Sequence, residues 1–251
     1  MRTLICRWLL AVSVLLLAAS PAAATSIGTG ETPIGSMELH LTVGDAHWGG
    51  SVAGESSKPN QYAVADGSYE GTGFEITWEG VSFDIDPGVS GNWSVTNNSG
   101  TTQLMILSVI VPVLPVGPSS LMFGSTSVTV GDSNFDGVGV LTNVAPGSAY
   151  IGLIDMAPVA ASALLVDPYV LAAPPGGTAS HTESFGVFPG SVPGPAVASS
   201  IGIQHVFTLT AHDSATFNST FYLIAVPEPG TLLLVVSGLA GLGLVRRGER
   251  Q

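Results

Sequence analysis

The sequence predicts an all-β protein, in which residues 25–225 form one antiparallel β-sandwich of the Ig-like or jelly-roll-like kind. Three observations predict this fold. Apolar and polar residues alternate with a period of two, no long segment has the period of a helix, and turn-forming residues separate the alternating segments. Many short strands joined by turns are typical of a sandwich, and about 200 residues suit one large domain.

The first predicted strands show their buried face directly. Apolar residues occupy positions 37, 39, 41 and 43, with Glu, His and Thr between them. Positions 74, 76 and 78 repeat the pattern, and it resumes at 81, 83 and 85, one position out of phase. Gly80 lies where the phase slips, so we predict a β-bulge there. Trp93 and Val95 continue the series in the next strand.

The later strands are separated by turn signals. The segment Gln103 to Val113 is apolar on both faces, which predicts a central strand that Pro112 and Pro115 end. Further strands are predicted at 127–130, 138–144, 149–154, 201–211 and 217–225, with turns at 86–88, 97–100, 145–147 and 213–214. The Ala-rich segment 157–166 predicts a short helix, and the Pro-rich segment 168–195 predicts a long loop between strands.

Residues 1–24 have the three parts of a secretory signal peptide, which we expect to form a signal helix. Arg2 and Arg7 flank a short polar beginning, Trp8 to Ala19 form an apolar core, and Ala22 and Ala24 offer a small-residue cleavage site. The apolar core is shorter than the roughly 20 residues of a spanning helix, which favours cleavage over an uncleaved anchor. Cys6 is the only cysteine, so the mature chain has no disulfide or thiolate site.

Residues 226–251 form a tail of three zones. Pro227, Glu228 and Pro229 predict an extended peptide, because proline fixes φ and lacks an N–H donor. The uncharged segment Thr231 to Val245 then predicts a single transmembrane helix of roughly 22 Å, short for a hydrocarbon core of about 30 Å. The cluster Arg246, Arg247 and Arg250 predicts that the chain's end stays cytoplasmic and the domain lies on the periplasmic side.

This order of motif, short apolar helix and arginine cluster resembles the PEP-CTERM sorting domain of Gram-negative bacteria, over residues 226–251 only. Pro227, Glu228 and Pro229 match its signature. The resemblance implies export, transient anchoring in the inner membrane, and cutting by an exosortase, a membrane protease that passes its substrates to the cell surface. It also implies an association with exopolysaccharide and biofilm.

The basic residues are concentrated in the two end segments. Only Lys58 lies between residues 25 and 225, whereas 16 of the 18 acidic residues do, because Glu228 and Glu249 belong to the tail. The region therefore has a net charge of −15 and would repel phosphate backbones, which excludes nucleic acid as a partner.

Asp132, Asn134 and Asp136 are the candidate metal ligands of the sequence. Oxygen side chains at every second position before Gly137 are typical of calcium loops. The expected glutamate at the twelfth position is replaced by Asn143, so a hairpin turn capped by Asp and Asn is the alternative. No other cofactor is expected.

No catalytic residue is predicted, because the common hydrolase and cofactor motifs are missing. His205 is expected in the core or at an edge, and Asp84 and Asp86 at the surface. Trp78 is expected in the core, and Trp48 either stacks on a sugar or anchors a loop. Two functions compete: a non-catalytic structural or interaction protein of the cell surface or matrix, which we favour, and a secreted polysaccharide-binding or polysaccharide-degrading protein.

Overall fold

A computed structural model describes residues 35–117, 120–186 and 191–226 of the protein. This part of the chain is all-β, and the pairings between its strands are antiparallel. Among the described residues, no helix is long and apolar enough to cross a membrane. The predicted signal helix at 1–24 and the predicted membrane segment at 231–245 lie outside the described residues.

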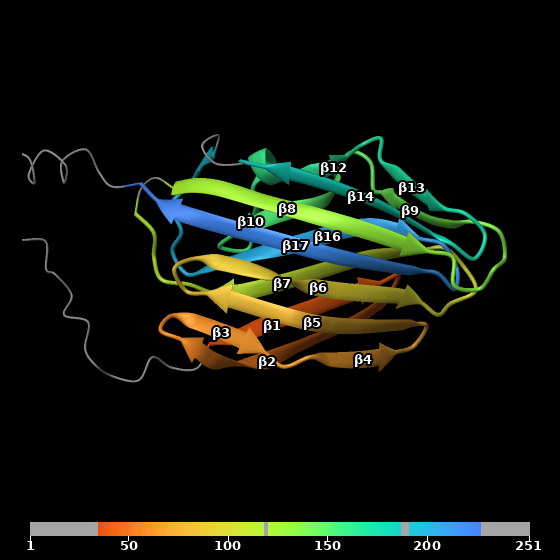
Figure 1. Ribbon diagram of the computed structural model, residues 1–251, viewed down its shortest axis with the longest axis horizontal. Coiled ribbons are helices and arrows are strands. Elements are labelled where there is room, and N and C mark those ends of the chain that lie inside the picture. The colour runs from red at the N-terminus through yellow and green to blue at the C-terminus, as the bar shows by residue number, and fades with distance from the viewer. Residues whose placement is uncertain (1–34, 118–119, 187–190, 227–251) are drawn as a thin grey trace, which may run out of the picture. The chain divides into compact units, whose positions relative to one another are not determined.

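The strands form two hydrogen-bonded sheets (Figure 1). Sheet I has the order β2, β1, β7, β16, after which β10 and β9 share the next edge, with β11 beyond β10 and β13 beyond β9. Its strands are β1 (Ser36–Val43), β2 (Ala46–Lys58), β7 (Gln103–Pro112), β9 (Gly139–Asn143), β10 (Ser148–Ile154), β11 (Ala157–Pro158), β13 (Val170–Ala173) and β16 (Ser200–Leu209). The short β12 (Leu164–Val166) pairs with β10.

Sheet II contains the remaining strands. The edge strands β3 and β4 both pair with β5, and the order continues through β6, β17 and β8 to β14 and β15. The bounds are β3 (Gln61–Val64), β4 (Gly67–Gly71), β5 (Phe74–Asp84), β6 (Gly88–Asn97), β8 (Ser120–Gly131), β14 (Thr178–Phe185), β15 (Val192–Gly194) and β17 (Ser214–Ala225). Strand β2 joins the sheets, because residues 46–53 pair with β1 and residues 54–58 pair with β3.

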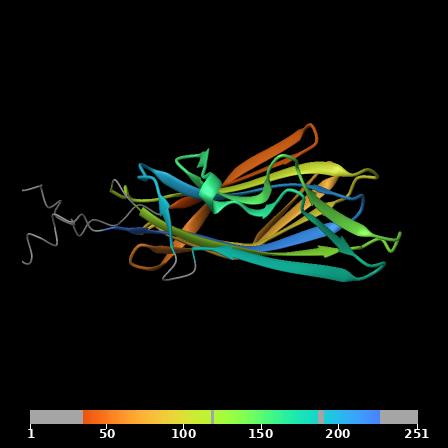
Figure 2. The same ribbon diagram turned by 90° about the horizontal axis from the view of Figure 1, so that it is seen from above.

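The inner faces of the two sheets pack against each other as two layers (Figure 2). Phe217 of β17 lies with its ring centroid 4.1 Å from that of His205 and 5.0 Å from that of Phe207, both on β16. All three side chains have no exposed surface. A sandwich core of interdigitating inward side chains follows from the period of two in each strand.

The β-bulge predicted at Gly80 is confirmed. The register between β5 and β6 shifts between Glu79 and Ser82, and Gly80 has a φ of 59°. The extra residue keeps both Trp78 and Val81 buried, at 8% and 1% exposure. Without the bulge, one of the two apolar runs of β5 would face solvent.

Several strand glycines lie opposite aromatic rings. Gly67 pairs with Trp78, and a Cβ at Gly67 would lie 2.4 Å from the Trp78 ring. Gly88 pairs with Tyr222, and a Cβ there would lie 2.4 Å from the Tyr222 ring. In each pair the aromatic ring of one strand lies over the backbone of the glycine on the neighbouring strand. The ring thus packs where the glycine has no side chain of its own.

The predicted short helix at 157–166 and the predicted long loop at 168–195 are both wrong. In the segment 157–166 only the three residues of η2 (Ala160–Ser162) are helical. Ser162 is buried, and its Oγ accepts a hydrogen bond from Gly152 N at 2.8 Å, which ties this segment to β10. The segment 168–195 is not a long loop, since it contains β13, β14 and β15, which take the free edges of β9 and β8. Strands β2, β3 and β4 were not predicted either.

Candidate ligand-binding face

The outer face of sheet II is lined by hydroxyl and amide side chains. On β6, β17 and β8 the outward positions alternate with buried ones, and on β14 they alternate with half-buried or exposed residues. We call the polar outward residues of these four strands the hydroxyl face. Its members are Ser90, Asn92, Ser94, Thr96, Ser214, Thr216, Asn218, Thr220, Ser125, Ser127, Thr129, Thr178, Ser180, Thr182 and Ser184. None of these side chains carries a charge.

Hydrogen bonds between hydroxyl groups connect neighbouring strands across this face. Oγ1 of Thr216 donates to Ser94 Oγ at 3.0 Å, which joins β17 to β6. Ser125 and Thr220 join β8 to β17 at 2.9 Å, and Thr182 donates to Ser127 at 3.0 Å, which joins β14 to β8. The hydroxyls are therefore held in place before any ligand arrives, which lowers the entropy cost of binding.

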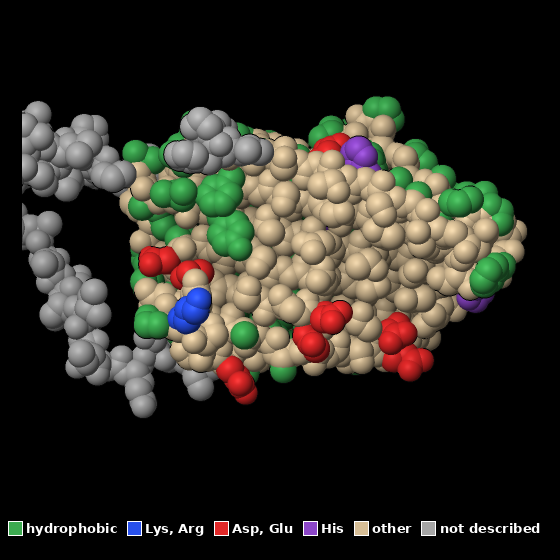
Figure 3. Space-filling view, in the orientation of Figure 1, with side chains coloured by type: hydrophobic (Ala, Val, Ile, Leu, Met, Phe, Trp, Pro, Cys, Tyr) green, Lys and Arg blue, Asp and Glu red, His purple; other side chains and the backbone are tan. Residues whose placement is uncertain are grey.

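The charged residues lie around the hydroxyl face and not within it. Figure 3 shows the middle of this side of the molecule without Lys, Arg, Asp or Glu, and acidic side chains gathered along its lower edge. Beside the face, Glu75, Glu79 and Asp84 of β5 point outward. On β14, Glu183 alternates with the members of the face, and its Oε2 accepts from Leu165 N at 2.7 Å.

An aromatic pair lies at the end of the hydroxyl face where β17 ends. Tyr222 of β17 stacks on Phe123 of β8, with ring centroids 5.3 Å apart and an interplanar angle of 13°. Both rings are half-buried, so part of each is open to solvent.

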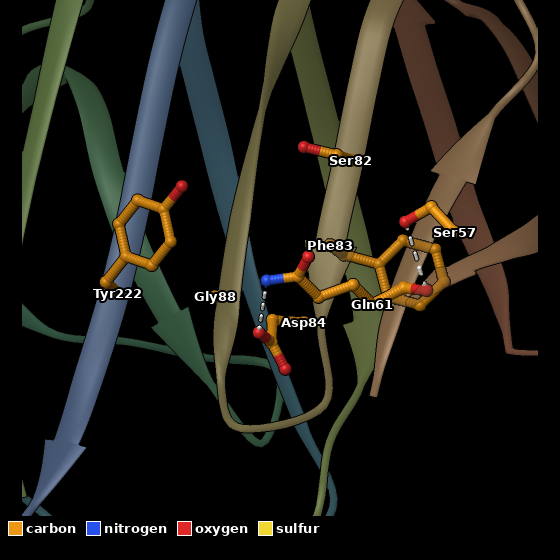
Figure 4. Close-up of a pocket in the computed structure, with 7 residues that line it drawn as sticks. All are labelled: Ser57, Gln61, Ser82, Phe83, Asp84, Gly88 and Tyr222. Atoms are coloured by element: carbon orange, nitrogen blue, oxygen red, sulfur yellow. Dashed lines mark hydrogen bonds between the residues drawn. The ribbon is translucent and has the colours of Figure 1, made fainter. Parts of the chain in front are cut away.

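Beside Tyr222 lies a hollow of about 130 Å³ (Figure 4). Tyr222 forms one side, Gly88 the floor between the strands, and Gln61, Ser57 and Asp84 the other side. Gln61 Nε2 donates to Asp84 Oδ2 at 3.2 Å, and the N–H of Asp86 donates to Asp84 Oδ1 at 2.9 Å. An aromatic ring facing an amide and a carboxylate can hold a ring-shaped, hydroxyl-bearing ligand by its face and by its edge.

The predicted metal ligands make backbone hydrogen bonds. Asp132 is 4% exposed, and its two carboxylate oxygens accept from the N–H groups of Phe135 (2.9 Å) and Gly176 (3.0 Å). Asn134 Oδ1 accepts from the N–H of Asp136 at 3.0 Å. Asn143, at the twelfth position, accepts from Tyr169 N instead. These contacts agree with a capped turn, and calcium binding at Asp132, Asn134 and Asp136 stays a prediction.

In the described part of the chain, no group of three or more His, Cys, Asp or Glu could hold a metal ion. His40 and His47 do stack on the outer face of sheet I, with ring centroids 6.0 Å apart. His40 also lies 3.5 Å from Glu38.

His205 is a core residue, as predicted, and takes part in a buried chain of polar groups between the sheets. Its Nδ1 lies 3.1 Å from the Ala149 carbonyl, so Nδ1 carries the proton and Nε2 accepts from Ser219 Oγ at 3.2 Å. Burial lowers the pKa of His205 to about 3, although the hydrogen bond to Ala149 opposes the shift. His205 and Ser219 have no exposed surface, so this pair cannot meet a substrate.

The tryptophans divide as the sequence indicated. Trp78 is buried, and its Nε1 donates to the Ala65 carbonyl at 3.0 Å. Trp48 is half-buried and stacks on Tyr69, with centroids 4.6 Å apart. Because Tyr69 covers its ring, Trp48 anchors β2 to β4, which supports the anchoring alternative.

In a comparison with known families, residues 225–247 match the PEP-CTERM protein-sorting motif. The chain carries this sorting motif. It indicates an exported protein that an exosortase sorts to the cell surface, and it confirms the resemblance seen in the sequence over this segment. The structure of Pro227, Glu228, Pro229 and the arginine cluster lies outside the described residues.

Comparison with curated proteins gives no match. Among solved structures, the chain is similar to TmCBM61, which was solved in complex with beta-1,4-galactotriose. The likeness has 14% identity and a TM-score of 0.26, and it covers 53% of this chain and 71% of that one. At that TM-score it carries no argument for a shared fold or ligand.

Sequence reasoning missed Tyr222, Phe123, Gln61 and the hydroxyl face. One signal was present: Ser, Thr, Asn, Thr and Tyr occupy alternate positions from 214 to 222, opposite the buried Ala215 and Phe217. The hollow itself gave no signal, because its residues come from β2, β3, β5, β6 and β17.

Proposed function

We propose that the exported protein is a non-catalytic binding module of the cell surface, whose hydroxyl face and aromatic hollow bind an extracellular polysaccharide. The single observation that carries the proposal is the hydroxyl face itself, an uncharged surface of hydroxyl and amide groups that ends at the Tyr222–Phe123 pair. Hydroxyl and amide groups both donate and accept, so they match the hydroxyl groups of sugars. Aromatic faces suit the apolar faces of sugar rings.

The charge distribution favours a neutral polysaccharide. The region between the end segments has a net charge of −15, and Asp84 lies in the hollow. An acidic polysaccharide would meet repulsion that a neutral one does not. We therefore expect affinity for neutral glycans that changes little with salt concentration.

A glycan screen combined with a reducing-sugar assay tests this function. The purified full chain in detergent is expected to bind one class of neutral glycan saturably and to release no reducing sugar. Turnover would support the degrading enzyme instead. Absence of both binding and turnover across the screen would contradict the proposal and favour a purely structural part.

We also propose that the tail anchors the protein transiently in the inner membrane, with the sandwich on the periplasmic side, before the exosortase acts. Glu228→Ala tests this sorting in a host that carries an exosortase. The variant is expected to keep its full intact mass after signal removal and to stay with the membrane fraction. The same mass and destination as the unchanged chain would contradict sorting through this motif.

A further inference from the structure

An apolar groove lies at the end of the sandwich from which the tail leaves. It has a volume of about 340 Å³. It is lined by Asp86, Pro87, Leu114, Pro115, Val116, Gly117, Leu223, Ile224 and Ala225. Leu114 and Ile224 stand at its rim with 50% and 47% of their surface exposed.

The groove is part of the fixed fold. Leu114 N donates to the Ile85 carbonyl at 3.0 Å, and Leu223 N donates to the Pro87 carbonyl at 3.0 Å. These bonds tie the connection after β7 and the last strand to the turn between β5 and β6. The rim residues therefore keep their positions on the surface.

Chain length places this groove close to the predicted membrane segment. Ala225 lines the groove, and five residues, 226–230, separate it from Thr231, where the uncharged segment begins. Five fully extended residues span at most about 18 Å. The uncharged segment is about 8 Å shorter than the hydrocarbon core, so anchoring by the arginine cluster would draw residues 226–230 into the headgroup region.

We infer that the groove and its rim, Leu114, Pro115 and Ile224, rest on the outer surface of the inner membrane while the tail is uncut. The ligand is the lipid surface itself, met through apolar contact. The contact is not electrostatic, because the sandwich carries only one lysine against its 16 acidic residues. This inference rests on the proposed anchoring and goes beyond it, since it orients the sandwich. The Tyr222 end of the hydroxyl face lies next to the groove and so near the membrane, and the rest of that face stays free.

Site-directed labelling tests this orientation, because the mature chain has no cysteine and Cys6 can be replaced by Ser. Leu114→Cys and Ile224→Cys each carry an environment-sensitive fluorophore in the full chain, reconstituted in phosphatidylcholine vesicles. Phe135→Cys is the matched control, an apolar side chain that is 76% exposed in the loop after β8. All three positions are at the surface, and circular dichroism checks that each variant folds.

The labels at 114 and 224 are expected to shift to the blue in vesicles and to become severalfold less accessible to iodide, while the label at 135 changes in neither respect. Equal iodide access at all three positions would overturn the inference. Without vesicles, the labels at 114 and 224 should stay open to iodide at every protein concentration. If iodide access instead falls as the protein concentration rises, the groove contacts a second copy of the chain and the inference is overturned.

Flotation of the same samples separates this inference from the proposals on which it rests. Chains that float with the vesicles but keep labels 114 and 224 open refute the orientation and leave anchoring intact. Chains that do not float refute anchoring and this inference together. Glycan binding by the same vesicles reports on the hydroxyl face independently of either result.

Discussion

The two faces of strand β17 differ completely, although their residues alternate along the same strand. The inward side carries Ala215, Phe217, Ser219, Phe221 and Leu223, all at 3% exposure or less. The outward side carries hydroxyls, one amide, Tyr222 and, near the strand's end, Ile224. Stability and binding therefore depend on opposite sides of one sheet, so a substitution on one side should affect mainly one of the two properties.

The largest expected effect is on the inner face. Phe217→Ala removes a fully buried ring that contacts His205 and Phe207 across the sandwich. We expect a loss of about 4 kcal/mol in the free energy of unfolding, measured by chemical denaturation. Thr216→Ala, the neighbouring outward position, is the control and should change stability by less than about 0.5 kcal/mol. Similar losses in both variants would break the comparison.

His205 gives the inner face a pH dependence. Its pKa is about 3 in the folded protein, against about 6.5 when unfolded, so between these values the unfolded chain binds the extra proton. Protonation of His205 therefore does not change the free energy of unfolding above about pH 6.5. Below that pH the free energy of unfolding falls by about 1.4 kcal/mol per pH unit, down to about pH 3.

Denaturation at a series of pH values measures that slope. A His205→Gln variant should lose this part of the slope, whereas the exposed His47→Gln should keep it. An unchanged slope in His205→Gln would show that other groups account for the acid sensitivity.

On the outer face the main expected effect is on binding. Tyr222→Ala should weaken polysaccharide affinity about tenfold, which corresponds to about 1.4 kcal/mol, because the open ring is lost. Isothermal titration measures the affinity, and the melting temperature should fall only modestly, because the stacking of Tyr222 on Phe123 is lost as well. Tyr69→Ala removes another exposed tyrosine, 37% exposed but stacked on Trp48 and outside the hollow. Equal weakening by Tyr69→Ala would refute the site.

The smallest effect concerns the bulge that keeps the two faces in phase on β5. Gly80 has a φ of 59° and no atom near the position of a Cβ, so Gly80→Ala meets only the backbone cost of about 1 kcal/mol. Thermal denaturation measures it. Gly100→Ala, equally open but without a positive φ, should have no comparable cost. A loss much larger than this in Gly80→Ala would mean that the register of β5 had moved.

The alternating strands and the bulge could be predicted from the sequence because their signals are local. Residues 74–85 contain both apolar runs and the glycine between them. The segment 168–195 misled because its strands gain their hydrogen bonds from β8 and β9, which lie far away along the chain. Strand β2 was missed because its Gly and Ser residues have low strand propensity, and pairing with β1 overrides it. The hollow depended on five separate strands, and no local pattern predicts such a meeting.

A charge placed at the middle of the uncharged hydroxyl face tests whether this face binds polysaccharide. Asn218 is exposed on β17, opposite Asn92 and Ser127. Titration with the glycan selected by the screen should show that Asn218→Glu loses binding. Ser51→Glu, which adds the same charge at an exposed position of β2, should keep it. Both variants should melt at a temperature close to that of the unchanged protein. Undiminished binding by Asn218→Glu would contradict the account.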